Sequence, residues 1–366
     1  MASLFEYLKE HQNDDFSDFA LNDVDRVCIN ELGYLPFGEI ASWSKGHKAS
    51  LNSFYQACRH QMEEDFLVSA DRLALLDVMA QSKRFKEIGI QYYESHITRE
   101  FERQFAAVTF TLSQTAGHQI VFRGTDDTLV GWKEDFKLSY VREIPSHRSA
   151  ISYLEEYLPH LDGEICLTGH SKGGNLALYA ASHLQEDLQA KISQILWFDA
   201  PGLEEGLLET SGYLAIKDKT RGYLPQDSIV GIMLWHDGDY QWVKSKSFGI
   251  NQHNIVLWQV TLEGAFIKAD KQTEVSRSLE LTFKDWMHEF SGQELKLVFD
   301  LVFDTFIDNG FESLNDFTLD ANKKLLSTIS QMQELDKKHK QLLTRAAKSL
   351  LKHFASHLLM NNKETS

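Results

Sequence analysis

The sequence predicts an α/β fold with a mostly parallel sheet and helices on both faces. Three short apolar runs, at residues 119–125, 165–168 and 192–199, alternate with segments in which apolar residues recur every three or four positions. Such alternation is typical of strand–helix–strand units, and strands that are apolar throughout are buried on both faces. At 366 residues and 43% hydrophobic, the chain can bury a large core and an appended subdomain.

Residues 1–103 are predicted to form a largely helical segment that packs on the edge of this sheet. Asn22 and the two aspartates that follow it can cap a helix that ends near Gly33. The segment contains no catalytic motif. Its histidines His47, His60 and His96 have no metal-binding residue beside them at helical or hairpin spacing, so we expect surface or packing roles for them.

Residues 104–270 are predicted to form the core of the fold, which opens on a β-hairpin. The β-rich runs 105–112 and 119–125 are separated by a glycine-containing turn around Gly117. The second run ends in Gly124-Thr125. A backbone N–H at such a strand end can help to stabilise an oxyanion, and Thr125 is our candidate donor. The alternative is that Gly124-Thr125 only turns the chain.

The central motif is Gly-His-Ser-Lys-Gly at residues 169–173, which joins an apolar strand directly to a helix-forming run. This is the context of a nucleophile elbow, a sharp turn that exposes a serine at the end of a strand. A side chain at Gly169 or Gly173 would collide where strand and helix approach closely. Ser171 is therefore the candidate nucleophile, and the backbone N–H of Lys172 is the second candidate oxyanion donor.

A serine hydroxyl needs a base to take its proton, and the base needs an acid that fixes its tautomer. His253 lies in a polar loop between β-rich runs and is the candidate base. Asp227 lies in a turn after a short β-like run, and the order Ser171, Asp227, His253 makes it the preferred acid. Asp199 remains a rival acid, because it also follows a strand and the strand ends converge.

Other acidic and histidine residues near these positions have simpler interpretations. Asp237 and Asp239 belong to an Asp-Gly turn that predicts a hairpin between residues 232–235 and 240–243, and His236 is part of the same turn. His170 lies within the elbow, and we expect it to support the geometry of the turn.

Several motifs together resemble a known family. They are Phe122-Arg123-Gly124-Thr125, the elbow continued to Gly174-Asn175, Asp199-Ala200-Pro201-Gly202, Pro225-Gln226-Asp227-Ser228-Ile229-Val230-Gly231 and Gln252-His253. This combination resembles the bacterial Mbeg-like α/β-hydrolases, a poorly characterised family similar to the class 3, fungal-type lipases. The resemblance covers roughly residues 22–260 and does not extend to the C-terminal helices.

The resemblance implies an α/β-hydrolase fold and a serine esterase or lipase-like activity. It implies Ser171 as nucleophile, Asp227 and His253 as its partners, and Thr125 with the N–H of Lys172 around the oxyanion. We expect an intracellular lipid or acyl ester as the substrate, because the class 3 lipases fill the elbow position of Lys172 with various residues and no secretion signal is recognisable. One alternative is a thioesterase or acyltransferase. The other is an idle scaffold that binds a partner protein or a membrane.

Composition excludes several other classes of function. The net charge of −16 argues against a nucleic-acid partner, which requires a basic face. The three cysteines Cys28, Cys58 and Cys166 are widely spaced, and we expect reduced, buried thiols. The proposed chemistry requires no metal or organic cofactor. No apolar run reaches membrane-spanning length, so a cytoplasmic location is expected.

Residues 271–366 are predicted to form a helical extension. An apolar stripe runs through residues 295–306, and the last helix combines an apolar stripe with a lysine-rich face from Lys337 to Lys352. We expect this helix to pack in a C-terminal bundle with its basic face in solvent. Peripheral contact with an anionic membrane is the alternative.

Overall fold

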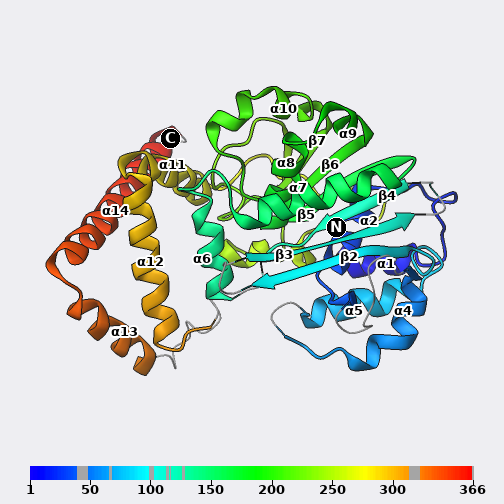
Figure 1. Ribbon diagram of the computed structural model, residues 1–366, viewed down its shortest axis with the longest axis horizontal. Coiled ribbons are helices and arrows are strands. Elements are labelled where there is room, and N and C mark those ends of the chain that lie inside the picture. Colours follow the sequence, from blue (N-terminus) through cyan, green and yellow to red (C-terminus); the bar gives the residue numbers. More distant parts are fainter. Residues whose placement is uncertain are drawn as a thin grey trace. The chain divides into compact units, whose positions relative to one another are not determined.

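The computed structural model describes residues 1–38, 48–65, 68–98, 103–112, 115, 117–125, 128–312 and 322–364. The chain divides into two compact units. The first consists of Met1–Gly124 and Pro145–Gln272, and the second of Thr125–Ile144 and Thr273–Ser366. The first unit contains the sheet and the second is helical (Figure 1).

One eight-stranded sheet runs through the described part of the first unit, with its strands in sequence order. The strands are β1 (Ala49–Ser50), β2 (Gly89–Thr98), β3 (Arg103–Leu112), β4 (Gly117–Phe122), β5 (Glu164–His170), β6 (Ile192–Phe198), β7 (Thr220–Pro225) and β8 (Asp239–Val243). Neighbours from β1 to β4 pair antiparallel, and those from β4 to β8 pair parallel. The carboxyl ends of β4 to β8 therefore meet at one edge of the sheet.

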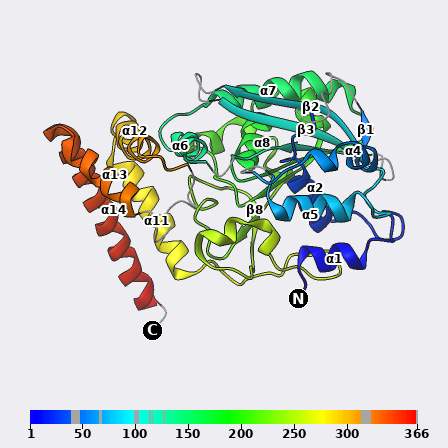
Figure 2. The same cartoon turned by 90° about the horizontal axis from the view of Figure 1, so that it is seen from below.

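Helices cover both faces of this sheet, as predicted. One face carries α7 (Pro145–Tyr157) and α8 (Lys172–Ser182), and the other carries α2 (Asp23–Leu32), with α1 (Leu4–Glu10), α4 (Leu51–Cys58) and α5 (Ala70–Met79) around it (Figure 2). Short helices α9 (Glu186–Lys191) and α10 (Ser211–Leu214) follow α8. Buried apolar side chains of α1, α2, α4, α5 and the strands form one continuous core.

The predicted hairpin at the start of the core is confirmed, because β3 and β4 pair antiparallel with Leu112 opposite Gly117. Residues 1–103, predicted to be largely helical, also contribute β1 and β2, which extend the sheet at its antiparallel edge. One expectation is wrong. The hairpin of residues 232–243 does not form: β8 pairs parallel with β7, and Trp235 instead bridges Leu203.

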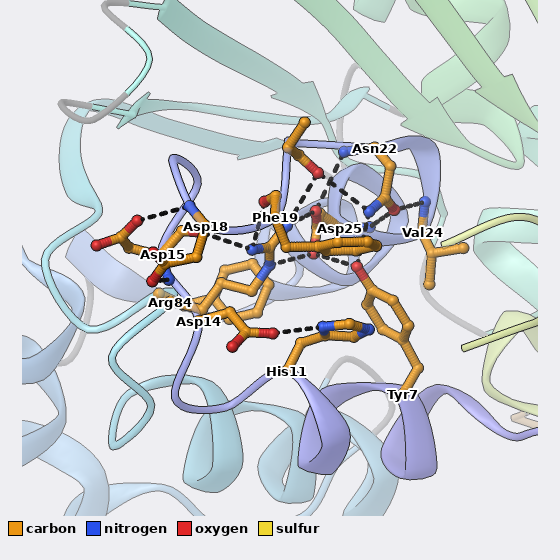
Figure 3. A network of polar contacts seen from close by, with 12 residues as sticks. Tyr7, His11, Asp14, Asp15, Asp18, Phe19, Asn22, Val24, Asp25 and Arg84 are labelled. Carbon is orange, nitrogen blue, oxygen red and sulfur yellow. Dashed lines mark hydrogen bonds and ion pairs between the residues drawn. The ribbon is translucent and has the colours of Figure 1, made fainter. Parts of the chain in front are cut away.

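A buried ion pair links the N-terminal helices (Figure 3). Arg84 Nε donates to Asp25 Oδ1 at 2.9 Å and Arg84 Nη2 donates to Asp25 Oδ2, and both side chains are fully buried. Asp25 also accepts from the Tyr7 hydroxyl at 2.9 Å and from the Asn22 backbone N–H at 3.1 Å. The remaining guanidinium N–H groups donate to the carbonyls of Asp15, Phe19 and Ala20. Every hydrogen-bonding group of this ion pair is thus satisfied inside the protein.

The second unit is built from helices around an aromatic core. Its helices are α6 (Leu129–Lys137), α11 (Glu274–Glu289), α12 (Gly292–Asp308), α13 (Asn322–Glu334) and α14 (Lys337–Glu364). Residues 125–144, which lie inside the predicted core of residues 104–270, belong to this unit. Within it, α14 packs against α11, and its Ala346 contributes to the core that contains Trp286 and Phe299. None of the helices in the described part of the chain is long and apolar enough to cross a membrane.

Candidate active site

The functional side chains of the first unit follow the carboxyl ends of neighbouring parallel strands. Gly124 lies two residues after β4, Ser171 directly follows β5, and Asp199 directly follows β6. Ser228 lies in the turn after β7. In open α/β sheets, chemistry concentrates at this edge because the loops there converge from several strands.

Ser171 occupies the strained turn that the sequence predicts. Its backbone has φ 56° and ψ −136°, a conformation that non-glycine residues rarely adopt, and its N–H donates to Phe198 O at 3.0 Å. A Cβ added to Gly169 would lie 2.1 Å from Gly173 C, and one added to Gly173 would lie 2.1 Å from Phe122 O. Both glycines are therefore required by the close approach of strand and helix.

The residues after this turn fix the loop that carries Asp199. A Cβ on Gly174 would lie 2.5 Å from the Ala200 Cβ, so α8 packs directly on that loop. The Asn175 amide donates to Gly202 O at 2.6 Å, and its oxygen lies 2.8 Å from Nε2 of the buried His147. The second glycine and the asparagine of the motif therefore hold the Asp199 loop against the elbow helix.

His253 contacts Asp199, and not the preferred candidate Asp227. The His253 Nδ1 atom lies 2.7 Å from Asp199 Oδ2. The other carboxylate oxygen of Asp199 accepts from the Ser228 hydroxyl and from the Gly231 N–H at 3.1 Å. Asp199 is fully buried and has a left-handed backbone, with φ 40°. These contacts aim one carboxylate oxygen at the imidazole, which is the arrangement that the acid of a triad requires.

Asp227 has a different place in the structure. Its carboxylate accepts from the Gly249 N–H at 3.2 Å and from the Gln252 amide at 3.1 Å, and Gln252 Oε1 accepts from the Asp227 N–H at 3.0 Å. Gln252 directly precedes His253 in a short 3₁₀ helix, Gly249–His253. Asp227 therefore fixes the loop that carries His253 through Gln252, the residue before it. The assignment of Asp227 as the partner of His253 is corrected to Asp199.

The imidazole of His253 packs against a second histidine. The ring of His170, the residue before Ser171, lies 4.4 Å from the His253 ring between centroids. His170 is buried, and burial, together with the positive charges of His253 and Arg72, lowers its pKa well below the ordinary value. The His170 ring is therefore neutral at physiological pH, and its lowered pKa makes it a weak proton acceptor beside the His253 ring.

A polar network that no sequence motif indicates contacts the His170 ring. The Tyr34 hydroxyl lies 3.3 Å from His170 Nδ1 and accepts from the Gly124 N–H at 3.2 Å. Arg72 stacks on the Tyr34 ring with its guanidinium carbon 3.6 Å from the centroid, and its Nε donates to the buried Glu31 at 3.1 Å. Helices α2 and α5 thereby reach the loop after β4. No local sequence pattern predicts such a contact.

Replacement of Tyr34 by phenylalanine is expected to lower the rate of the reaction proposed below about tenfold. The buried N–H of Gly124 would lose its acceptor, which costs about 1–3 kcal/mol and frees the loop beside Ser171. The measurement is kcat with a chromogenic ester. Tyr213→Phe is the matched control, because the Tyr213 hydroxyl donates to Asp237 O near the opposite ends of the strands. Equal rates for the two variants would contradict this role of Tyr34.

The two candidate oxyanion donors lie in different units. Lys172 is the first residue of α8, so its backbone N–H belongs to the positive end of that helix. Thr125 directly follows Gly124 in sequence and begins the second unit, where its hydroxyl donates to Asp135 Oδ1 at 2.6 Å. Gly124, whose added Cβ would lie 3.2 Å from the Ser171 Cβ, is the residue of this strand end that contacts the elbow within the first unit.

The cysteines do not compete with Ser171 as nucleophiles. Cys28, Cys58 and Cys166 are free and buried, as the sequence predicted. Burial raises the pKa of the Cys166 thiol to about 11 and that of Cys28 well above its ordinary value. A thiol is reactive as the thiolate, so these groups are inert at neutral pH.

Three solved structures of lipases are similar to parts of this chain. A lipase of Rhizomucor miehei in complex with its propeptide is 17% identical over 46% of this chain and 58% of its own, with a TM-score of 0.35. A fungal lipase in an inhibitor complex is 14% identical over 66% of this chain and 82% of its own, with a TM-score of 0.39. M37 lipase is 16% identical over 57% of this chain and 68% of its own, with a TM-score of 0.35. The chain thus spans little more than half of the Rhizomucor chain.

The search of curated proteins gave no match. Residues 79–304, more than half of the chain, match the Mbeg1-like family. This stretch contains the strained serine turn, the Asp199 loop and the His253 loop, all at the carboxyl edge of a mostly parallel sheet. The chain has the α/β-hydrolase fold and belongs to the Mbeg1-like family.

Proposed function

We propose that this protein is a serine hydrolase that cleaves carboxylic esters through an acyl-enzyme intermediate. The observation that carries the proposal is the Asp199–His253 pair, whose imidazole packs on His170, the residue before Ser171. Ser171 itself has a positive φ in the turn directly after β5. A strained, buried turn of this kind costs of order 1–3 kcal/mol and persists where a function requires it. In this assignment Ser171 is the nucleophile, His253 the base and Asp199 the acid.

The proposed reaction has two steps. His253 Nδ1–H donates to Asp199, which leaves Nε2 as the atom that takes the proton of Ser171. The serine oxygen attacks the ester carbonyl, and His253 then gives the proton to the leaving alcohol. Water, deprotonated by the same histidine, attacks the acyl-enzyme and releases the acid. Within the first unit, the backbone N–H of Lys172 is the proposed oxyanion donor.

The substrate that we propose is a lipid or another acyl ester. The three solved lipases similar to this chain share too little with it to transfer a substrate. Thioesters and acyl transfer pass through the same acyl-enzyme, and they differ only in the leaving group or in the acceptor that replaces water. A panel of esters and thioesters of graded acyl length separates these possibilities by kcat/KM.

The proposal is tested by labelling with a fluorophosphonate, which reacts with an activated serine. We expect the full chain to be labelled and Ser171→Ala to be unlabelled. Ser182→Ala is the matched control, because Ser182 lies at the far end of the same helix and its hydroxyl donates to Tyr179 O. Absence of labelling in the folded wild-type protein would leave an idle scaffold, and labelling of Ser171→Ala would place the nucleophile elsewhere.

A further inference from the structure

A cluster of histidines and carboxylates lies between α11 and α14 in the second unit, and the proposed hydrolysis does not use it. His353 and His357 are one helical turn apart on α14, and Asp285 and Glu289 are one turn apart on α11. Residues four apart project from the same face of a helix. The Trp286 indole donates to Ala346 O at 3.0 Å and holds the two helices together beside the cluster.

The ring of His353 faces a carboxylate on each side. Its Nε2 lies 3.1 Å from Glu289 Oε2, and its Nδ1 lies 3.6 Å from Asp285 Oδ2. The same Asp285 oxygen lies 2.7 Å from His357 Nε2. Glu289 is held in turn by the hydroxyl of the buried Ser349. One oxygen of Asp285 is therefore approached by both imidazoles.

A neutral imidazole has one N–H donor and one lone pair. When His353 Nε2–H donates to Glu289, the lone pair on Nδ1 faces the Asp285 carboxylate, and the two negative regions repel each other. A cation between Nδ1 and the carboxylate removes this repulsion. The cation can be a second proton on the ring or a metal ion. His357 Nε2, 2.7 Å from the same Asp285 oxygen, offers a third ligand atom to a metal ion.

We propose that Asp285, His353 and His357 bind a divalent transition-metal ion, with Zn²⁺ as the reference ion. One ligand atom from each of these residues lies within 4.8 Å of the others. Ligand bonds of about 2.0–2.2 Å then require only small side-chain adjustments. Two histidines four residues apart on a helix form a known chelating arrangement. Imidazole and carboxylate together suit zinc better than magnesium or calcium.

Glu289 has a separate role in this site. With Nδ1 of His353 on the metal, its Nε2–H donates to the Glu289 carboxylate, which orients the ring and raises its basicity. Three protein ligands leave at least one coordination position for water or another ligand. The metal would join α11 to α14, so it is expected to stabilise the second unit.

The experiment is calorimetric titration of Zn²⁺ into the EDTA-treated full chain. We expect one saturable site, and loss of that site in the H353Q/H357Q double variant. Glu289→Gln is expected to weaken binding about 10–100-fold, because it removes the orienting carboxylate and leaves all three ligands. His339→Gln is the matched control, because His339 lies on the same helix and pairs with Asp336. It is expected to bind zinc as the wild type does.

One further measurement and one further variant keep the outcome decisive. Far-UV circular dichroism without metal shows whether the double variant retains its helices. If its spectrum is altered, Asp285→Asn takes its place as the ligand variant. The proposal would be overturned if the wild type and the folded ligand variant bound zinc with equal affinity. It would also be overturned if the wild type showed no saturable zinc binding, and that result would assign the cluster to proton-dependent pairing of the helices.

Discussion

Replacement of Asp199 by asparagine is expected to lower kcat for ester hydrolysis about 10⁴-fold and to leave the fold intact. The carboxylate accepts from His253 Nδ1, which keeps the proton on that nitrogen and leaves Nε2 free to act as the base. An asparagine side chain can present its NH₂ group to Nδ1, which stabilises the opposite tautomer. The measurement is kcat with a chromogenic ester, at enzyme concentrations high enough to detect the residual rate.

Asp227→Asn is the matched control for this experiment. Asp227 contacts the Gly249 N–H and the Gln252 amide, and an asparagine oxygen can still accept from them. We expect a loss of tenfold or less. Ser228→Ala is a second control, because it removes one of the two contacts on the other oxygen of Asp199 and leaves the oxygen that faces His253 unaltered. A large loss in Asp227→Asn with an active Asp199→Asn would restore Asp227 as the acid.

The elbow could be predicted from sequence because its requirements are local. A strand, a helix and glycines at fixed positions around Ser171 determine the turn, and the structure has φ 56° there. The acid could not be predicted in the same way. Asp199 and Asp227 follow neighbouring parallel strands, β6 and β7, so chain order alone allows either. Contacts from Ser228 and Gln252, distant in sequence from the residues they position, decide which carboxylate faces the imidazole.

Long-range packing also explains which parts of the fold could not be predicted from the sequence. Strand β2 is a polar strand whose neighbour β1 has only two residues, so it lacks the continuous apolar pattern of β5 and β6. The Asp-Gly pair at residues 237–238 is a good hairpin signal, yet Trp235 bridges Leu203 and β8 joins β7 in parallel. Helix α6 belongs with helices that follow it by more than 130 residues, which no local pattern reveals.

The second large effect is expected for stability, at the ion pair between Arg84 and Asp25. Arg84→Met should lower the free energy of unfolding of the first unit by about 3–5 kcal/mol, because it leaves the fully buried Asp25 carboxylate without its cation. It also removes the donors to three main-chain carbonyls. The measurement is hydrogen exchange of the α2 peptide at increasing urea, which follows the first unit separately in a chain of two units.

The neighbouring lysine is the matched control for this variant. Lys83 pairs with Asp15 and Asp18 at 3.1 and 3.0 Å, but its side chain is half exposed, so Lys83→Met should leave the unfolding of α2 unchanged within error. Equal effects of the two variants would contradict the role of burial. The double variant Arg84→Met/Asp25→Asn is expected to be more stable than Arg84→Met alone, because it no longer buries an unpaired charge. If Arg84→Met acted only through lost packing, the double variant would be no more stable than Arg84→Met. The sign of the interaction energy between the two substitutions therefore separates charge pairing from packing.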